Sequence, residues 1–299
     1  MMRLEYESGL ALTVGGAEED YELRLDGRLL PGTPDVRRLG ALEPMLCCPP
    51  PLTDREREQV LYRMYRGVVR LTAGLPWGGR PLDYRYDVTV FKPGSFGGEY
   101  LKTSGHYHPP VPGSDLSYPE VYEVLHGSVL FILQETADHT RGPDEIVIRR
   151  IVLLRAHAGQ KAVMPPNYGH WSINTDPAQP LVMANWISDS CASRYAPVER
   201  AGGAAVYVCE GEGVIPGEPI RLVRNRRYAH LPAEVEYAVP ADQPGLGLAA
   251  GRPMLGALLA EPARWTYLCD PAGHSEPMLQ AIRIVHQSPL PEAAGSAPR

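Results

Sequence analysis

Lysine, cysteine and long apolar stretches are scarce in this chain of 299 residues. Nowhere does an apolar run approach the roughly 18 residues that a membrane-spanning helix needs, so we expect no membrane partner. Residues 1–7 carry several charges and no apolar segment, so we expect no secretory signal. The five cysteines are odd in number and sparsely spaced, which fits a reducing cytoplasm better than a disulfide framework or a zinc ribbon.

Positive charge is not concentrated anywhere along the chain. The net charge is -6, only three lysines occur, and no basic stripe is visible, which excludes an ordinary nucleic-acid-binding surface. Hydrophobic residues make up 44% of the chain, as in soluble globular domains. Glycine (30) and proline (31) are abundant, and this density favours short strands joined by turns over long helices.

The chain divides by pattern into three parts. We predict an N-terminal extension over residues 1–80 that packs on a central barrel, with a strand over Tyr21–Leu25 and a helix over Arg55–Tyr65. Thr53 or Asp54 would cap that helix. The glycine- and proline-containing stretch Leu75–Leu82 predicts a loop. Residues 206–299 predict a C-terminal extension with short strands over Val206–Cys209, Ile220–Val223 and Ile282–Val285 and a helix over Met254–Leu259. We expect its last ten or so residues to be disordered.

Residues 81–205 contain short segments rich in β-branched and aromatic residues, separated by turn signals. Strands are predicted over Tyr86–Phe91, Glu99–Thr103, Val121–Leu125, Val129–Gln134, Ile146–Leu154, Lys161–Met164, His170–Asn174 and Leu181–Ile187. So many short strands in a little over a hundred residues predict an all-β domain, either a small barrel or a sandwich.

Two histidines form an H-x-H pair in Gly105-His106-Tyr107-His108. Residues two apart on an extended strand point to the same side, so His106 and His108 offer two imidazoles to one point in space. Neutral imidazole is a common metal ligand. The pair alone is also compatible with two exposed strand histidines.

A carboxylate and a third imidazole complete a candidate metal site. Alternation along Pro119–Leu125 places Glu120 and Tyr122 on one face and Glu123 on the other. We select Glu120 because six residues separate it from Gly127, a spacing that matches the family motif described in the next paragraph. His170 follows a turn and opens a strand, which suits a position at the mouth of a barrel.

Together these pieces resemble the cupin superfamily. Its first motif is H-x-H, a glutamate, six residues and a glycine, and its second runs from a glycine through a proline and a glycine to a histidine and an asparagine. The second motif fits Gly159, Pro165, His170 and Asn174, with Asn167 in place of its second glycine. Asparagine tolerates positive φ better than most residues. Eleven residues, Pro109–Pro119, separate the histidine pair from Glu120, more than in most cupins. The resemblance implies an antiparallel, jelly-roll-like barrel.

A closer resemblance, over roughly residues 35–206, is to the cupin-type phosphoglucose isomerases. It is carried by Thr89–Gly94, Glu99–His108, Glu120–Tyr122, Leu133-Gln134 and Val36–Leu39. This resemblance implies one divalent metal ion (iron, zinc, nickel or manganese) held by His106, His108, Glu120 and His170. It also implies a cytoplasmic, homodimeric enzyme of glycolysis and gluconeogenesis that interconverts glucose 6-phosphate and fructose 6-phosphate.

The same resemblance assigns the substrate-binding residues. Thr89, Thr103, Gly105 and Tyr195 would hold the sugar phosphate. Glu120 would act as the catalytic base, and Tyr122 would hydrogen-bond a sugar oxygen, although core packing is an alternative for Tyr122.

Two positions depart from the family. Trp186 aligns with a family tyrosine, and a family histidine has no equivalent near Ser193-Arg194. Arg194 is either a compensating phosphate ligand or a solvated loop residue. Three other functions therefore stay open: a related cupin enzyme acting on another phosphorylated or carbonyl compound, a non-catalytic sugar-sensing cupin, and a dioxygenase.

Overall fold

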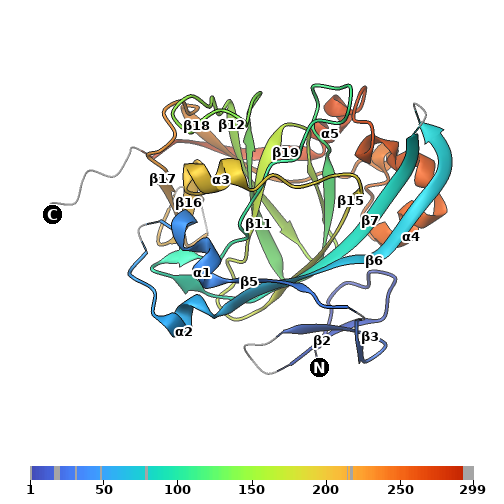
Figure 1. The fold of residues 1–299 in the computed structure, drawn as a ribbon, viewed down its shortest axis with the longest axis horizontal. Coiled ribbons are helices and arrows are strands. Elements are labelled where there is room, and N and C mark those ends of the chain that lie inside the picture. The colour runs from blue at the N-terminus through green and yellow to red at the C-terminus, as the bar shows by residue number, and fades with distance from the viewer. Residues whose placement is uncertain are drawn as a thin grey trace.

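The computed structural model describes residues 2–16, 21–30, 32–47, 49–77, 80–213, 215 and 218–291. It confirms the predicted all-β class, in which two large sheets form the barrel and short helices lie outside it (Figure 1). No helix within the described ranges is long and apolar enough to cross a bilayer.

The first large sheet carries most of the candidate site. Its six strands run in the order β13 (Lys161–Met164), β10 (Glu120–His126), β15 (Leu181–Ser188), β7 (Arg80–Phe91), β6 (Val60–Trp77) and β5 (Asp35–Arg38). All neighbours are antiparallel. These strands alternate between a face that lines the barrel interior and a face that packs outward, as the pleat requires.

The second large sheet closes the barrel. Its strands run in the order β14 (Tyr168–Ile173), β11 (Ser128–Glu135), β12 (Arg150–His157), β18 (Glu234–Pro240) and β19 (Ile282–Pro289). The pair β12–β18 is parallel, so the C-terminal part of the chain adds two strands to this sheet. Contacts such as the tilted rings of Tyr122 and Phe131, with centroids 5.2 Å apart, join the two sheets across the interior.

Two smaller sheets flank the barrel. One contains β1 (Met2–Arg3), β2 (Leu12–Gly15), β3 (Glu22–Leu25) and β4 (Arg28–Leu29), and the other β17 (Ile220–Arg224), β16 (Val206–Glu210), β9 (Glu99–Tyr100) and β8 (Ser95–Phe96). The helices are α1 (Leu39–Leu42), α2 (Asp54–Arg57), α3 (Ala196–Ala201), α4 (Met254–Ala260) and α5 (Ser275–Gln280).

Residues from both ends of the chain cover the outer face of the six-stranded sheet. Leu23 from the N-terminal sheet and Leu255 and Trp265 from the C-terminal region share one buried cluster with Tyr86 and Trp186 of that sheet. In Figure 1, β2 and β3 lie beside β6, and α4 lies beside the β6–β7 hairpin. The outward face is therefore apolar and protected from water.

Two local predictions are wrong. The helix begins at Asp54 with Thr53 as its cap, but it ends at Arg57, and the chain from Val60 onward is strand β6. The stretch predicted as a loop over Leu75–Leu82 belongs to strands β6 and β7, with residues 78 and 79 outside the described ranges. Strand β6 pairs with β7 as far as Trp77 and Arg80. This pairing explains why the chain on both sides of residues 78 and 79 is extended.

Three predictions outside the barrel have different outcomes. The helix predicted near residue 254 is confirmed as α4. Disorder at the C-terminus concerns residues 292–299, which lie outside the described residues, whereas β19 continues to Pro289. The division of the chain at residues 80 and 205 stays a prediction, although β5 and β6 contribute strands to the barrel sheet.

Candidate metal centre and substrate pocket

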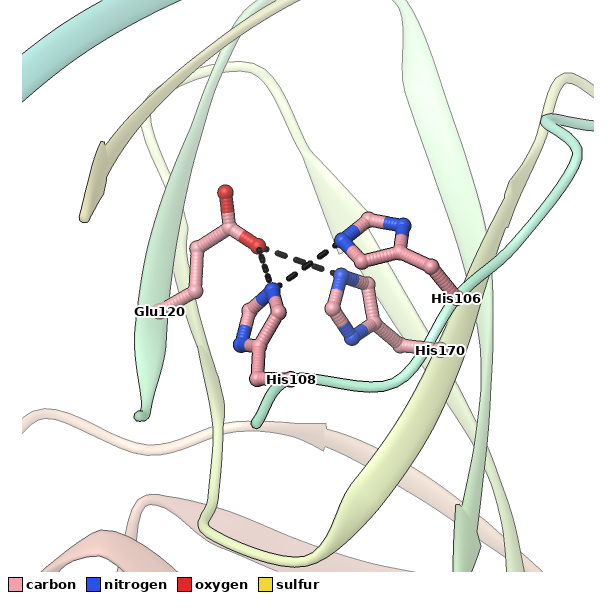
Figure 2. Close-up of side chains that lie close together, drawn as sticks. All are labelled: His106, His108, Glu120 and His170. Atoms are coloured by element: carbon pink, nitrogen blue, oxygen red, sulfur yellow. Dashed lines mark hydrogen bonds and ion pairs between the residues drawn. The ribbon is translucent and has the colours of Figure 1, made fainter. Parts of the chain in front are cut away.

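Four side chains meet at one point inside the barrel. His106 and His108 come from the segment after β9, Glu120 begins β10, and His170 lies in β14 (Figure 2). One ligand atom from each lies within 4.8 Å of the others. The backbone pairing of His106 with His170 brings the H-x-H segment beside β14 and fixes this arrangement. The long loop does not displace Glu120, which takes its predicted place.

The distances between donor atoms are short. His106 Nε2 and His108 Nε2 are 3.0 Å apart, and Glu120 Oε2 lies 3.1 Å from His170 Nε2 and 3.5 Å from His108 Nε2 (Figure 2). Glu120 Oε2 and His170 Nε2 are nevertheless left without a hydrogen-bond partner among the described residues. Buried polar atoms without a partner are costly, so this donor set fits a cation at its centre.

The long loop fixes the tautomer of one imidazole. His108 Nδ1 lies 2.8 Å from the carbonyl oxygen of Tyr118, and because a carbonyl only accepts, Nδ1–H donates. His108 Nε2 therefore presents its lone pair to the centre, as a metal ligand must. The loop over Pro109–Pro119 thus supplies a supporting carbonyl that the motif alone does not reveal.

Protonation states also suit a cation. Burial, together with the neighbouring imidazole of His170, holds the pKa of His106 well below its ordinary value, and burial lowers the pKa of His108 to about 4. Burial alone would raise the pKa of Glu120, but the His170 and His108 imidazoles outweigh it and keep that pKa low. At neutral pH the site therefore presents the neutral imidazoles of His106 and His108 beside the charged Glu120 carboxylate.

A pocket opens beside these four side chains. It is lined by Tyr62, Met64, Arg66, Arg85, Asp87, Thr89, Thr103, Gly105, His106, Glu120, Tyr122, His170, Ser172, Met183, Asn185, Ile187, Ser193 and Tyr195. All four residues predicted to bind substrate are in that set, and so is Tyr122. Tyr122 hydrogen-bonds the Glu120 carboxylate, and burial raises its pKa well above the ordinary value, so its hydroxyl stays protonated.

The predicted substrate ligands have free donor capacity. Thr103 Oγ1 accepts a hydrogen bond from Ser172 N at 2.9 Å, which leaves its own proton available to the pocket. Gly105 has a positive φ of +70°. The centroids of the Tyr195 and His106 rings are 5.3 Å apart.

Two residues that seemed relevant from the sequence lie elsewhere. Trp186 is buried on the outer face of the sheet against Tyr86, while its neighbours Asn185 and Ile187 face the pocket. Arg194 Nη1 lies 3.2 Å from His139 Nε2 and does not line the pocket. Ser193, near which the sequence shows no equivalent of the family histidine, lines the pocket.

Sequence reasoning missed the contribution of β6 to the pocket and, on β7, identified only Thr89. Tyr62, Met64 and Arg66 alternate along β6, and Arg85 and Asp87 along β7, all toward the interior. For Tyr62 and Met64 the signal was their period-two spacing, which the helix prediction over Arg55–Tyr65 concealed.

Taken together, the barrel and the three-histidine, one-glutamate cluster define a cupin with a centre that fits a metal ion. A family model described as "Glucose-6-phosphate isomerase (GPI)" matches residues 51–219, more than half of the chain. The chain belongs to the glucose-6-phosphate isomerase family.

Two curated relatives carry the same name. "Glucose-6-phosphate isomerase" of Thermococcus litoralis is 27% identical over 138 residues, which cover 46% of this chain and 64% of the relative. The protein of that name from Thermococcus gammatolerans is 24% identical over 147 residues, 49% of this chain and 66% of the relative. The chain thus spans slightly less than two thirds of the length of either relative.

Similarities among solved structures are weaker. Oxalate oxidase in complex with glycolate gives a TM-score of 0.28 at 17% identity, over 45% of this chain and 56% of that chain. Vicilin from Capsicum annuum gives a TM-score of 0.25 at 15% identity, over 37% and 24%. At these scores neither similarity carries a functional argument.

Proposed function

We propose that the protein is a metal-dependent isomerase that interconverts glucose 6-phosphate and fructose 6-phosphate. The observation that carries this proposal is the convergence of four metal-type donor groups beside the pocket of a chain that belongs to the isomerase family, with Glu120 and His170 each leaving a buried donor atom without a hydrogen bond among the described residues. A cytoplasmic homodimer, and iron, zinc, nickel or manganese as the metal, are expectations that belong to the same proposal.

A divalent cation held by His106, His108, Glu120 and His170 would act as a Lewis acid toward the oxygens on C1 and C2 of the open-chain sugar. The protein's own groups would then move and hold protons. Glu120 lies at the pocket wall with its pKa held low, so it is in the basic form that proton abstraction requires. Tyr122 stays protonated and donates its single proton to the Glu120 carboxylate, so its hydroxyl oxygen would be left to accept a hydrogen bond from a sugar hydroxyl.

Isomerisation moves one hydrogen between C1 and C2, and one proton between the oxygens on those carbons, by one of two routes. In the first, Glu120 takes a proton from one carbon and returns it to the other through a cis-enediol. In the second, the hydrogen passes directly between the carbons as a hydride, and Glu120 serves only as a ligand. Glucose 6-phosphate labelled with deuterium at C2 separates the two routes, because only the first route exchanges the label with water.

A coupled assay of fructose 6-phosphate conversion tests the proposal. We expect turnover by the wild type and a loss of about 10²–10⁴-fold in kcat for Glu120→Gln, which removes a base and a charged ligand. Glu123→Gln is the matched control, because Glu123 lies on the same strand and points to the opposite face. A folded wild-type protein inert on hexose phosphates, whatever metal is supplied, contradicts the proposal.

A second candidate is favoured by one feature of the pocket. Arg85, Asp87 and Asn185 add polar groups to the wall, which would suit a substrate with more polar substituents than a hexose phosphate. This candidate is a related cupin enzyme acting on another phosphorylated or carbonyl compound, and turnover of such compounds in place of fructose 6-phosphate identifies it.

A further inference from the structure

Two arginines lie on the pocket side of the sheet edge formed by β5 and β6. Arg37 of β5 is paired with Tyr62 of β6, and directly opposed residues of antiparallel strands share a face. Because Tyr62 lines the pocket, Arg37 emerges on the pocket side as well. Arg66 lies on the same face of β6, four residues beyond Tyr62, and itself lines the pocket.

Arg37 is a half-buried cation with no carboxylate partner among the described residues. The hydrogen bond found for its guanidinium joins Nη1 to the carbonyl oxygen of Val36 at 3.5 Å. Its Cζ lies 5.9 Å from the centre of the Tyr195 ring, one of the pocket walls. Arginine carries five N–H donors, so most of its donor capacity is left for a ligand.

Arg66 is held in place but is not saturated. Its Nε donates to Asp35 Oδ2 at 2.7 Å and its Nη1 to Asp87 Oδ2 at 3.4 Å. Nη2 contacts the sulfur of Met64 at 3.5 Å, a weak acceptor. Arg66 lines the same pocket as His106 and Glu120, so it borders the space beside the donor cluster.

The neutral donors predicted for the phosphate lie at the same end of the pocket. Ser104 stands between Thr103 and Gly105, and its backbone N–H donates to the Tyr62 hydroxyl at 3.1 Å. Tyr62 is the residue opposite Arg37. The threonine and glycine donors and the two arginines therefore meet around Tyr62, and the arginines supply the positive charge that neutral donors lack.

We propose that Arg37 and Arg66 form an anion clamp that binds the phosphate group of the substrate in this pocket. The inference rests on the proposed function in taking a sugar phosphate as the substrate. Guanidinium groups suit this role because they stay charged and donate two parallel hydrogen bonds to phosphate oxygens.

The test uses full-length Arg37→Gln and Arg66→Gln variants, with Arg63→Gln as the matched control. Arg63 lies between Tyr62 and Met64, so it points to the opposite face of β6, and its substitution removes the same charge. Arg37→Gln leaves no described carboxylate without a partner, so it separates loss of binding from loss of folding. Circular dichroism verifies the fold of each variant.

Two readouts are measured for each protein. The first is KM and kcat for fructose 6-phosphate; the second is calorimetric binding of inorganic phosphate and of sorbitol 6-phosphate, which requires no turnover. We expect each clamp variant to raise KM and weaken both phosphate ligands by about 10–100-fold, with kcat nearly unchanged and Arg63→Gln like the wild type. Binding of unphosphorylated sorbitol should be the same in all four proteins.

The outcomes separate this inference from the proposed function. Clamp variants that bind inorganic phosphate and sorbitol 6-phosphate as tightly as the wild type overturn the clamp, and so does a wild type that binds neither. Arginine-dependent phosphate binding by a wild type that does not convert fructose 6-phosphate supports the clamp and overturns the isomerase.

Discussion

Gly105 offers a sharp test of how the backbone before His106 is positioned. Its φ of +70° is strained for any residue with a side chain. A Cβ added there would lie 1.9 Å from Trp171 Nε1 and 2.2 Å from two neighbouring ring atoms. Trp171 is fully buried, so its ring has no free space into which to move.

We therefore predict that Gly105→Ala lowers the free energy of unfolding by about 2–5 kcal/mol. The left-handed backbone accounts for about 1–2 kcal/mol, and forcing a methyl group against a packed ring accounts for about 1–3 kcal/mol. Because His106 is the next residue, the same change should also weaken metal binding.

Gly113→Ala is the control for the backbone contribution. Gly113 has φ +83°, but a Cβ there meets nothing within 4 Å, so it should cost only the left-handed contribution of about 1–2 kcal/mol. Urea denaturation of the two variants measures the difference. A Gly105→Ala protein no less stable than Gly113→Ala would refute the argument that Trp171 fills the space above Gly105.

Three further predictions concern other parts of the molecule. Burial raises the pKa of Glu123 to about 7, despite its ion pair with Lys161 and the hydrogen bonds it accepts from Met254 N, so the folded state holds a proton that the unfolded state releases near pH 4.5. The free energy of unfolding should therefore fall as pH rises from about 4.5 to 7, by roughly 3 kcal/mol; denaturation at several pH values should show this fall in the wild type but not in Glu123→Gln. Lys102 and Glu99 form a buried ion pair. Lys102→Met should therefore lower the free energy of unfolding by about 3–5 kcal/mol, and the double variant with Glu99→Gln should lower it much less. Additive losses in a double-mutant cycle would contradict this. Asn167→Ala should lower the free energy of unfolding by about 1–3 kcal/mol in a thermal or urea melt, because alanine is strained at the backbone φ of +67° and the side-chain hydrogen bond to Ser117 N is lost. Asn167→Gly should cost less, because glycine adopts this φ without strain. Equal losses would show that backbone strain is unimportant here.

The donor set was accessible from the sequence because its signals are local. An H-x-H pair on extended chain must point one way, and alternation along β10 correctly placed Glu120 and Tyr122 apart from Glu123. Asn167, which stands where the motif has glycine, does adopt positive φ. What alternation did not reveal is that Glu123 faces a buried layer, and not solvent, because chain ends distant in sequence cover that face.

The errors arose where tertiary pairing overrode local preference. Thr53 and Glu56 form a genuine capping box, so the start of a helix was read correctly. The helix nevertheless stops after one turn, because β6 pairs with β7 and β5 and buries Tyr62 inside the barrel. Strand β18 was missed because charged residues interrupt its pattern, and its parallel partner β12 is distant in sequence.

The arginine pair was not predictable for a related reason. Its two members come from β5 and β6, and their shared face depends on a cross-strand register that no local pattern specifies. Sequence alone suggested Arg194, which lies outside the pocket. The cluster of metal-type donors was thus readable from motifs, while the two arginines were not.

Reloading a metal-stripped sample while following fructose 6-phosphate turnover tests the central claim most directly. We predict negligible turnover after chelation, recovery in proportion to the divalent metal bound, saturation at about one ion per chain, and neither binding nor recovery in His170→Ala. Full activity in metal-free protein would contradict it.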